Sequence, residues 1–187
     1  MKNLNIDWLL KSSTALLFLF LLNGPLMAQS GRNHIAIGLE AGPSLGFGAE
    51  DFPYHLGLPV KAYLGTGQHG QWMFRTGGHL FPVSSQNLHE SVRRAYRYIV
   101  PLALGYRYNL ENWYAEGSLG LGLSTFVQVP TDAQFQRQAW TSRELNYGVE
   151  FGYQLEHFDL GVSLNNNGPI PHNTMFLGLK AMYKIRL

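Results

Sequence analysis

Hydrophobic and polar residues alternate with a period of two along much of this chain. The segment 145–155 shows the pattern without interruption: one parity carries Leu, Tyr, Val, Phe, Tyr and Leu, and the other carries Asn, Gly, Glu, Gly and Gln. Because successive side chains of a β-strand point to opposite faces of a sheet, this pattern predicts a strand with one apolar face. Its length is about that of a tilted strand that crosses a bilayer.

The same alternation predicts strands in seven further segments. The segment 72–80 is the weakest of them, because Thr76 and Gly78 interrupt its apolar parity. No helical periodicity of useful length appears after the N-terminal region. The eight predicted strands span residues 35–45, 56–65, 72–80, 97–108, 113–124, 145–155, 158–165 and 175–187.

The connections between these segments alternate in length. The long ones span residues 46–54, 82–96, 128–144 and 166–174, and the short ones span 65–70, 109–112 and 156–157. Long loops on one rim and short turns on the other are typical of membrane barrels with an even strand number. The chain is therefore predicted to be all-β, an eight-stranded antiparallel up-and-down transmembrane β-barrel.

A soluble, lipocalin-like barrel would also alternate, but with its apolar parity inside. The positions of the aromatic residues favour the membrane barrel, since they fall on the apolar parity and gather near the strand ends. Two aromatic girdles at the headgroup level are expected of a barrel that faces lipid. The predicted girdles are Trp72, Phe74, Tyr106, Tyr108, Trp113, Phe151, Tyr153, Phe158 and Tyr183 at the short-turn rim, and Tyr98 and Tyr147 at the other rim.

The second parity is mostly Gly, Ser and Ala, with single charges of both signs. An eight-stranded barrel is just wide enough for side chains to fill its interior, and small residues leave room for a few long ones. We interpret the charges as a structural network in the lumen rather than as a pore or a proton path. The predicted lumen charges are Glu40, Lys61, Arg75, Arg107, Glu116, Glu150, Asp159, Lys180 and Lys184, with Arg186 following on the same parity.

The N-terminal region has the parts of a secretory signal peptide. Lys2 and Lys11 precede an apolar run at 15–22, a breaker follows at 23–25, and Ala28 supplies a small residue. The run is shorter than the roughly 20 residues of a membrane helix. We predict a signal peptide at 1–28, cleaved after Ala28, and a barrel domain at 29–187.

Composition adds three restrictions. Charged residues make up only 14% of the chain, against about 25% in ordinary soluble domains. The chain has no cysteine, which excludes disulfides, thiolate metal sites and a lipid-anchored cysteine. The formal net charge of +2 gives no indication of a nucleic-acid partner.

The last strand carries a further signal in its alternating residues Leu179, Ala181, Tyr183, Ile185 and Leu187. This strand resembles the C-terminal strand that outer-membrane barrels offer to the barrel-assembly machinery, although Phe is the usual last residue there. Residues 29–187 resemble small eight-stranded outer-membrane β-barrel proteins such as the OmpA transmembrane domain, OmpX and the Bacteroidota-type barrel domains. The resemblance implies localisation in the outer membrane of a Gram-negative bacterium and contact with lipid and lipopolysaccharide. Because the sequence stops at the eighth predicted strand, we expect no peptidoglycan-binding domain of the OmpA type.

The residues give little indication of catalysis or metal binding. A chain that resembles the lipid A deacylases of this size would carry a His-x-Ser-Asn signature on a late strand. The nearest stretch here, around Ser163 and Asn165, lacks the histidine. Ser163 also falls on the lumen parity, whereas lipid chemistry needs the lipid-facing wall. No two histidines show the spacing of a metal-binding motif, and most are placed in loops or at strand ends. The histidines are His34, His55, His69, His79, His89, His157 and His172.

We therefore expect an integral outer-membrane barrel with a structural or surface-interaction role and without catalytic activity, cofactor or metal. A lipid A-modifying enzyme, a channel, and a barrel subunit of a secretion or transport machine remain alternatives. An extracellular or envelope protein is the expected partner. The loop aromatics are the candidate contact residues, namely Phe47, Phe52, Tyr54, Phe135 and Trp140.

Overall fold

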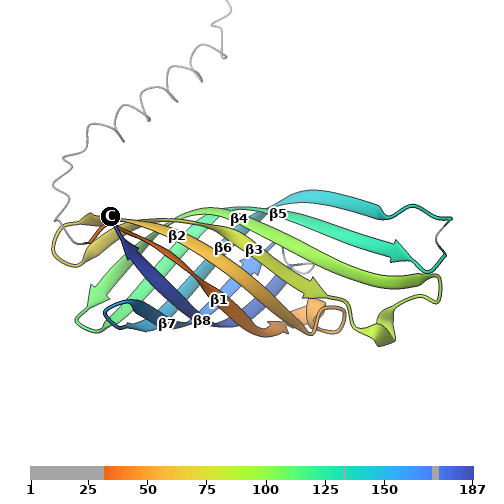
Figure 1. Ribbon diagram of the computed structural model, residues 1–187, viewed down its shortest axis with the longest axis horizontal. Coiled ribbons are helices and arrows are strands. Elements are labelled where there is room, and N and C mark those ends of the chain that lie inside the picture. Colours follow the sequence, from red (N-terminus) through yellow and green to blue (C-terminus); the bar gives the residue numbers. More distant parts are fainter. Residues whose placement is uncertain (1–31, 133, 170–172) are drawn as a thin grey trace, which may run out of the picture.

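The computed structural model describes residues 32–132, 134–169 and 173–187, which form a closed barrel of eight strands (Figure 1). Two short 3-10 turns, η1 (Gly46–Ala49) and η2 (Ser85–Asn87), lie in the connections after the first and third strands. The strands are β1 (His34–Leu45), β2 (Tyr54–Thr66), β3 (Gly70–Pro82), β4 (Val92–Leu110), β5 (Trp113–Pro130), β6 (Gln138–Gln154), β7 (Phe158–Asn167) and β8 (Thr174–Arg186). The predicted signal peptide, 1–28, lies outside the described residues.

Each strand pairs with its neighbours in the sequence, and β1 closes the barrel by pairing with β8. That pairing is antiparallel and runs from His34 opposite Arg186 to Leu45 opposite Met175. All other neighbouring pairs are also antiparallel and consecutive. The predicted fold class, an antiparallel up-and-down barrel of eight strands, is confirmed.

The two faces of the barrel wall differ as the alternation predicts. On β6, Leu145, Tyr147, Val149 and Phe151 face outward and are exposed, while the intervening residues, including Glu150, are buried in the lumen. The remaining strands show the same division over most of their length. A wall with an apolar outer face and a polar inner face is the arrangement of a membrane barrel.

Aromatic side chains form contacts on the outer face near the short turns. Trp113 stacks on Phe151 with ring centroids 5.3 Å apart and meets Tyr153 edge-on at 5.0 Å. Trp72 packs against Tyr106 across β3 and β4 at 5.4 Å. Phe158 and Tyr183 make a similar contact at 5.3 Å. These pairs form the girdle that the sequence predicts at this rim.

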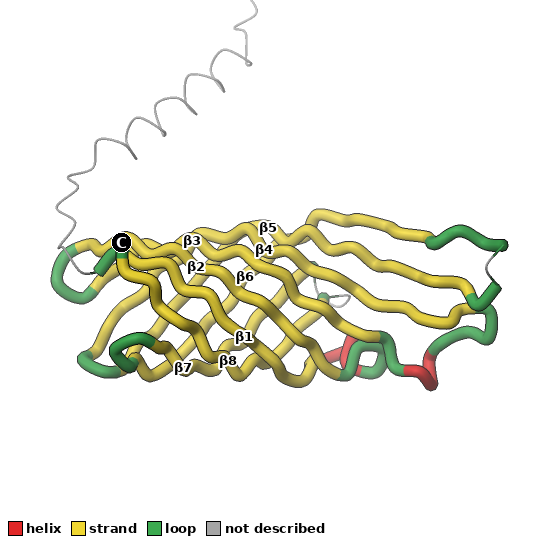
Figure 2. Tube along the Cα trace, viewed as in Figure 1, coloured by secondary structure: helices red, strands yellow, loops and turns green. Residues whose placement is uncertain are grey.

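The long connections are shorter than predicted, because β4, β5 and β6 continue beyond the other strands (Figures 1 and 2). The predicted loop 128–144 is wrong over most of its length, since β5 continues to Pro130 and β6 begins at Gln138. The predicted loop 82–96 is wrong over 92–96, which belong to β4. At Gln138–Arg143 every side chain is exposed, so no contrast between two faces marks the strand in the sequence.

This additional strand length forms a three-stranded sheet at the loop end of the barrel, here called the outer extension. It comprises residues 92–97 of β4, 125–130 of β5 and 138–144 of β6. The short turns and the C-terminus lie at the opposite end (Figure 1). No helix among the described residues is long and apolar enough to span a membrane.

Candidate functional site

The centre of the lumen holds a chain of ion pairs. The Lys61 ammonium, on β2, donates to Glu116 on β5 and lies 2.8 Å from Glu150 Oε2 on β6. Tyr63 and Tyr114 donate to these two carboxylates from the side, at 2.7 and 2.8 Å respectively. Two carboxylates thus share one ammonium group, and each also accepts a phenol hydrogen bond.

The chain continues toward β8 and β1. The Lys180 ammonium lies 2.6 Å from Glu150 Oε2 and 3.2 Å from Glu40 Oε2. Glu40 Oε1 in turn accepts a hydrogen bond from Ser163 at 2.8 Å. Four strands are connected through these side chains, and all of the groups are buried.

A second branch extends toward the short-turn end. Arg107 Nη1 lies 3.4 Å from Glu116 Oε1 and 2.5 Å from Asp159 Oδ2. Its guanidinium also covers the ring of Tyr114, 3.7 Å from the centroid. Lys184 lies 3.0 Å from the other oxygen of Asp159, at the edge of the lumen.

The remaining predicted lumen charges are placed differently. Arg75 is buried, but amide oxygens of Asn146 and Asn165 accept its hydrogen bonds in place of carboxylates. Arg186 is exposed at the short-turn rim, 4.0 Å from Glu156, so its assignment to the lumen is wrong. The strand has left the lumen there, so its parity no longer selects an inner face.

Two apolar clusters occupy the lumen on either side of the charges. Ala36, Tyr63, Met73 and Met182 pack together toward the short turns. The second cluster fills the loop end, and here it is called the outer plug: Phe52, Phe81, Ile99 and Phe176, with Val83 and Phe126 against them. The lumen between the two ends is therefore filled by side chains.

Phe52 enters the outer plug from the loop that follows η1. Its amide donates to the Gly48 carbonyl at 3.0 Å, and the Arg97 guanidinium lies 4.5 Å from its ring centroid. Phe52 is buried, so this candidate contact residue is not available to a partner at the surface. Tyr54, Phe135 and Trp140 are exposed as expected.

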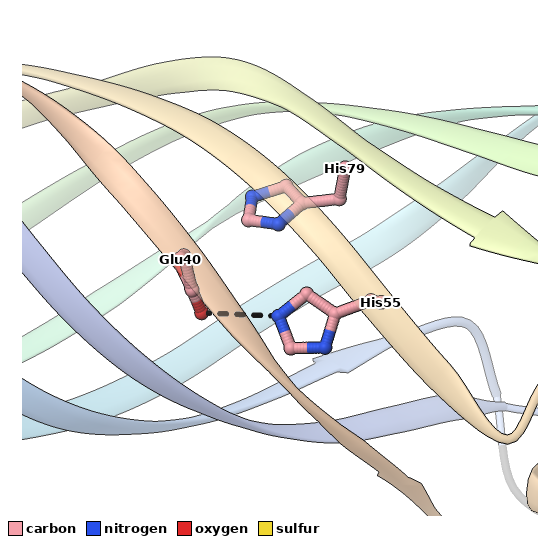
Figure 3. Close-up of side chains that lie close together, drawn as sticks. All are labelled: Glu40, His55 and His79. Carbon is pink, nitrogen blue, oxygen red and sulfur yellow. Dashed lines mark ion pairs between the residues drawn. The ribbon is translucent and has the colours of Figure 1, made fainter.

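Glu40, His55 and His79 lie close together inside the barrel (Figure 3). The two histidines contact Phe81 and Phe176 of the outer plug. One ligand-type atom of each residue lies within 4.8 Å of the other two, and all three residues are buried. His55 Nε2 points at Glu40 Oε1 over 3.6 Å. The sequence spacing of these residues gave no indication of the cluster, because their proximity depends on the pairing of β1, β2 and β3.

The other histidines are dispersed. His34 is buried at the short-turn end of the lumen, stacked on Tyr63 with ring centroids 4.4 Å apart. His69, His89 and His157 are exposed. His172 lies outside the described residues. Ser163, the residue nearest to a hydrolase pattern, is buried in the lumen and donates to Glu40.

The outer extension offers a different kind of surface. β6 pairs with β7 only from Asn146 onward, so its segment 138–144 pairs with β5 alone and its other edge has no partner strand among the described residues. The two strands of the hairpin are joined across their face by Thr125 and Thr141, whose hydroxyls lie 2.9 Å apart. Arg93, Arg94 and Arg143 are exposed on the same extension.

No protein-family model matches the sequence, and no curated protein sequence matches it. The fold is nevertheless shared with solved outer-membrane barrels. Ail of Yersinia pestis, solved in complex with the heparin analogue sucrose octasulfate, matches with a TM-score of 0.64 and 16% identity, covering 83% of this chain and 99% of Ail. The N-terminal β-barrel domain of Pseudomonas aeruginosa OprF matches with a TM-score of 0.56 and 12% identity, covering 83% and 100%.

OprG of Pseudomonas aeruginosa gives a similar result, with a TM-score of 0.54 and 13% identity over 84% of this chain and 98% of OprG. These similarities extend over nearly the whole of each solved chain. They show that this protein has the fold of the small eight-stranded outer-membrane barrels. At such low identity the similarity shows a shared fold but gives no information about ligand or activity.

Proposed function

We propose that this protein is an integral outer-membrane barrel of a Gram-negative bacterium that binds an extracellular or envelope protein through its outer extension, without catalysis. The observation that carries the proposal is the edge of β6 at 138–144, which has no partner strand among the described residues. An exposed edge presents unpaired backbone N–H and C=O groups to which another strand can be added. Trp140, exposed on the same segment, offers an aromatic anchor.

The filled lumen supports a binding role over conduction. Charged side chains occupy its centre, and the outer plug occupies its loop end. An eight-stranded barrel has little room beyond its own side chains. Planar-bilayer recordings of the purified barrel should therefore show no conductance steps.

The position of Ser163 supports the proposal that the protein does not modify lipid A. Its hydroxyl is buried and donates to Glu40, whereas a lipid-modifying nucleophile must reach the outer wall. Lipid A from a deletion strain should therefore have the same mass spectrum as lipid A from the parent strain. A changed acylation pattern would contradict this part of the proposal.

The proposal includes export and insertion. Residues 1–28 act as a signal peptide cleaved after Ala28, and β8 serves as the strand that the barrel-assembly machinery receives. Lipid and lipopolysaccharide then surround the apolar outer face. Mass spectrometry of the mature chain tests the cleavage site directly.

The interaction surface can be tested by site-specific crosslinking, because the chain has no cysteine of its own. A single cysteine at Ser142 carries a photo-crosslinker in whole cells, and a matched cysteine at Glu156 probes the opposite rim. The proposal predicts a discrete protein adduct from Ser142 and none from Glu156. Proline removes one backbone donor: Thr141→Pro is combined with the cysteine at Ser142, and Ser142→Pro is combined with a cysteine at Thr141. One of the two donors faces the free edge, so one of these variants should lose the adduct that the same cysteine gives without the proline, while the barrel stays folded.

A second candidate ligand is an anionic polysaccharide, which the exposed arginines of the extension favour. Arg93, Arg94 and Arg143 are exposed there, and Ail, with the same fold, was solved with a sulfated sugar. Retention of the folded barrel on a heparin column should then decrease as the salt concentration rises. At a given salt concentration the double variant Arg93→Gln/Arg94→Gln should be retained less than the parent. Arg186→Gln, at the other rim, is the matched control. Retention that is equal in all three proteins would exclude this candidate.

A further inference from the structure

Glu40, His55 and His79 are brought together by strand register inside the barrel. Glu40 of β1 lies opposite Gly57 of β2, and Gly57 lies opposite His79 of β3. His55 is two residues from Gly57 on the same strand and so shares its inward face. Three adjacent strands thus each supply one side chain to one part of the lumen.

Two glycines provide the space for this cluster. A Cβ at Gly57 would lie 2.6 Å from His79 Nδ1, and a Cβ at Gly178 would lie 2.0 Å from Glu40 Oε1. Real side chains do not approach so closely, so a larger residue at either position would displace the cluster. The sequence therefore leaves room for these three polar groups in a lumen that is otherwise filled.

The hydrogen bond of His55 determines which of its nitrogens carries the proton. Nδ1 lies 3.1 Å from the Gly42 carbonyl, which can only accept, so Nδ1 must donate. In the neutral ring, Nε2 then has a lone pair and no proton, and it faces Glu40 Oε1 at 3.6 Å. Two lone pairs that face one another in a buried site are unfavourable, and either a second proton on Nε2 or a metal ion between the two atoms would relieve this.

His79 contributes a second unpartnered nitrogen. Its Nδ1 has no hydrogen-bond partner among the described residues, and the residue is 4% exposed. Buried polar atoms without a partner are rare, and each indicates a bound water, an ion or a functional role. His55 Nε2 also has no hydrogen-bond partner among the described residues, and one ring nitrogen of each of the two buried imidazoles lies within 4.8 Å of a Glu40 carboxylate oxygen.

The surroundings hold Glu40 in place. Ser163 donates to Oε1 at 2.8 Å, and Lys180 lies 3.2 Å from Oε2. Lys180 is also 2.6 Å from Glu150, whose carboxylate lies 2.8 Å from the Lys61 ammonium as well. Oε2 of Glu40 therefore pairs with Lys180, and Oε1 is the oxygen that faces His55.

Aromatic rings shield the cluster from water. Phe176 lies 4.5 Å from the ring centroid of His55 and 5.3 Å from that of His79. Phe81 stacks on His55 at 5.4 Å. Exclusion of water strengthens the attraction between a bound cation and its ligands.

We propose that Glu40, His55 and His79 bind a divalent transition-metal ion of the zinc class inside the barrel. Two imidazoles and one carboxylate are ligands of this class, and two ligand atoms of a tetrahedral zinc ion lie about 3.4 Å apart. The Glu40–His55 separation of 3.6 Å already matches that distance. The ligand atom of His79 lies within 4.8 Å of the other two, and a movement of His79 toward them completes a three-ligand set, with water in the fourth position.

The bound ion connects β1, β2 and β3 and therefore stabilises the folded barrel, since the unfolded chain does not hold the three ligands together. This role is independent of the proposed interaction at the outer extension. The competing occupant is a second proton on His55, which would make His55 and Glu40 a simple ion pair. The experiment must separate a metal ion from that proton.

The test uses the full mature chain without a histidine tag, refolded in detergent and freed of metal with a chelator. Folding is verified by electrophoresis with and without boiling. Co²⁺ is then titrated while the visible absorption is recorded, and Zn²⁺ is added last. The proposal predicts a single saturable site with the absorption of a low-symmetry, four-coordinate ion, from which Zn²⁺ displaces Co²⁺.

His55→Gln and His79→Gln remove one ligand each and keep a polar side chain. Each should weaken Co²⁺ binding by more than the roughly 10–100-fold that loss of an outer-shell partner causes. Ser163→Ala, which loses such a partner, should fall within that range. His157→Gln, an exposed histidine at the other rim, is the matched control and should bind as the parent does.

Two results would overturn the proposal. One is a folded parent chain that gives no Co²⁺ spectrum and the same melting temperature with Zn²⁺ as with chelator. The other is binding that His55→Gln and His79→Gln leave unchanged. Because the first measurement uses only the parent chain, it decides the question even if the variants fail to fold.

Discussion

The two halves of β6 make the clearest comparison in this molecule. From Leu145 to Gly152 the side chains alternate between an exposed apolar set and a buried polar set. From Gln138 to Arg143 the strand continues with the same pairing to β5, yet every side chain is exposed. Apolar and polar residues therefore alternate only where the two faces of a strand meet different environments. A strand with the same environment on both faces shows no alternation.

The two halves of β6 belong to parts of the molecule with different expected roles. The lower half of β6 belongs to a wall whose inner face carries Glu150 and whose outer face carries Val149. The upper half belongs to the outer extension, where the chain faces water on both sides and one edge has no partner strand among the described residues. Stability should therefore depend on the wall, and binding on the extension.

The largest expected effect lies on the inner face. Glu150→Gln removes the carboxylate that Lys61, Lys180 and Tyr114 share. Loss of one partner in a buried ion network typically costs about 3–5 kcal/mol of the free energy of unfolding. Denaturant titrations of the barrel in lipid vesicles, followed by tryptophan fluorescence, measure this value.

Glu90→Gln is the matched control, because Glu90 is exposed in the connection between β3 and β4. Its free energy of unfolding should stay within about 0.5 kcal/mol of the parent. Equal losses in the two variants would show that the lumen charges do not stabilise the barrel.

The second-largest effect is the difference in stability cost between a charge on the outer face of the wall and a charge on the outer extension. Val149→Arg places a charge on an outward position that is 60% exposed, and near the bilayer midplane this costs about 2–4 kcal/mol. Ser142→Arg, on the same strand in the extension, should cost almost nothing because water surrounds it. The same vesicle titrations compare the two variants, and a penalty at Ser142 equal to that at Val149 would remove the distinction between the two halves.

The smallest effect lies within the extension. Thr125→Val removes one partner of the hydroxyl contact with Thr141 across β5 and β6. A cross-strand pair of this kind contributes roughly 0.2–1 kcal/mol. Hydrogen exchange of the 138–144 amides should accelerate while that of 145–154 is unchanged. Acceleration throughout β6 would mean that the two halves unfold as one unit.

The sequence was sufficient to predict the parts of the fold where the alternation has a physical cause. All eight strands, their order and the aromatic girdle follow from side chains that separate lipid from lumen. The extension was predicted as loop because residues 92–96 and 138–144 are not sorted by such a contrast. Arg186 was assigned to the lumen because parity was extended beyond the rim.

The interior contacts depended on register, which parity alone does not supply. Parity predicts that Glu40, Lys180 and Glu150 share the inner face, but it does not predict which acid meets which base. That depends on the pairing of β1 with β8 and of β7 with its neighbours. His55 and His79 were missed for the same reason, and the sequence pattern predicted no metal. The signal in the sequence was that both lie on the inward parity of their strands, in phase with Gly57 and Arg75.

The wall of this barrel faces lipid while the outer extension faces water, and spin labels at the two places distinguish these environments. Since the chain has no cysteine, single cysteines at Val149, Thr141 and Ser142 can each carry a nitroxide label in bilayers. Electron paramagnetic resonance then compares relaxation by oxygen, which concentrates in lipid, with relaxation by a water-soluble nickel chelate. We predict that oxygen dominates at Val149 and that the nickel chelate dominates at both Thr141 and Ser142. Dominance of the nickel chelate at Val149 in the folded protein would show that the wall does not face lipid.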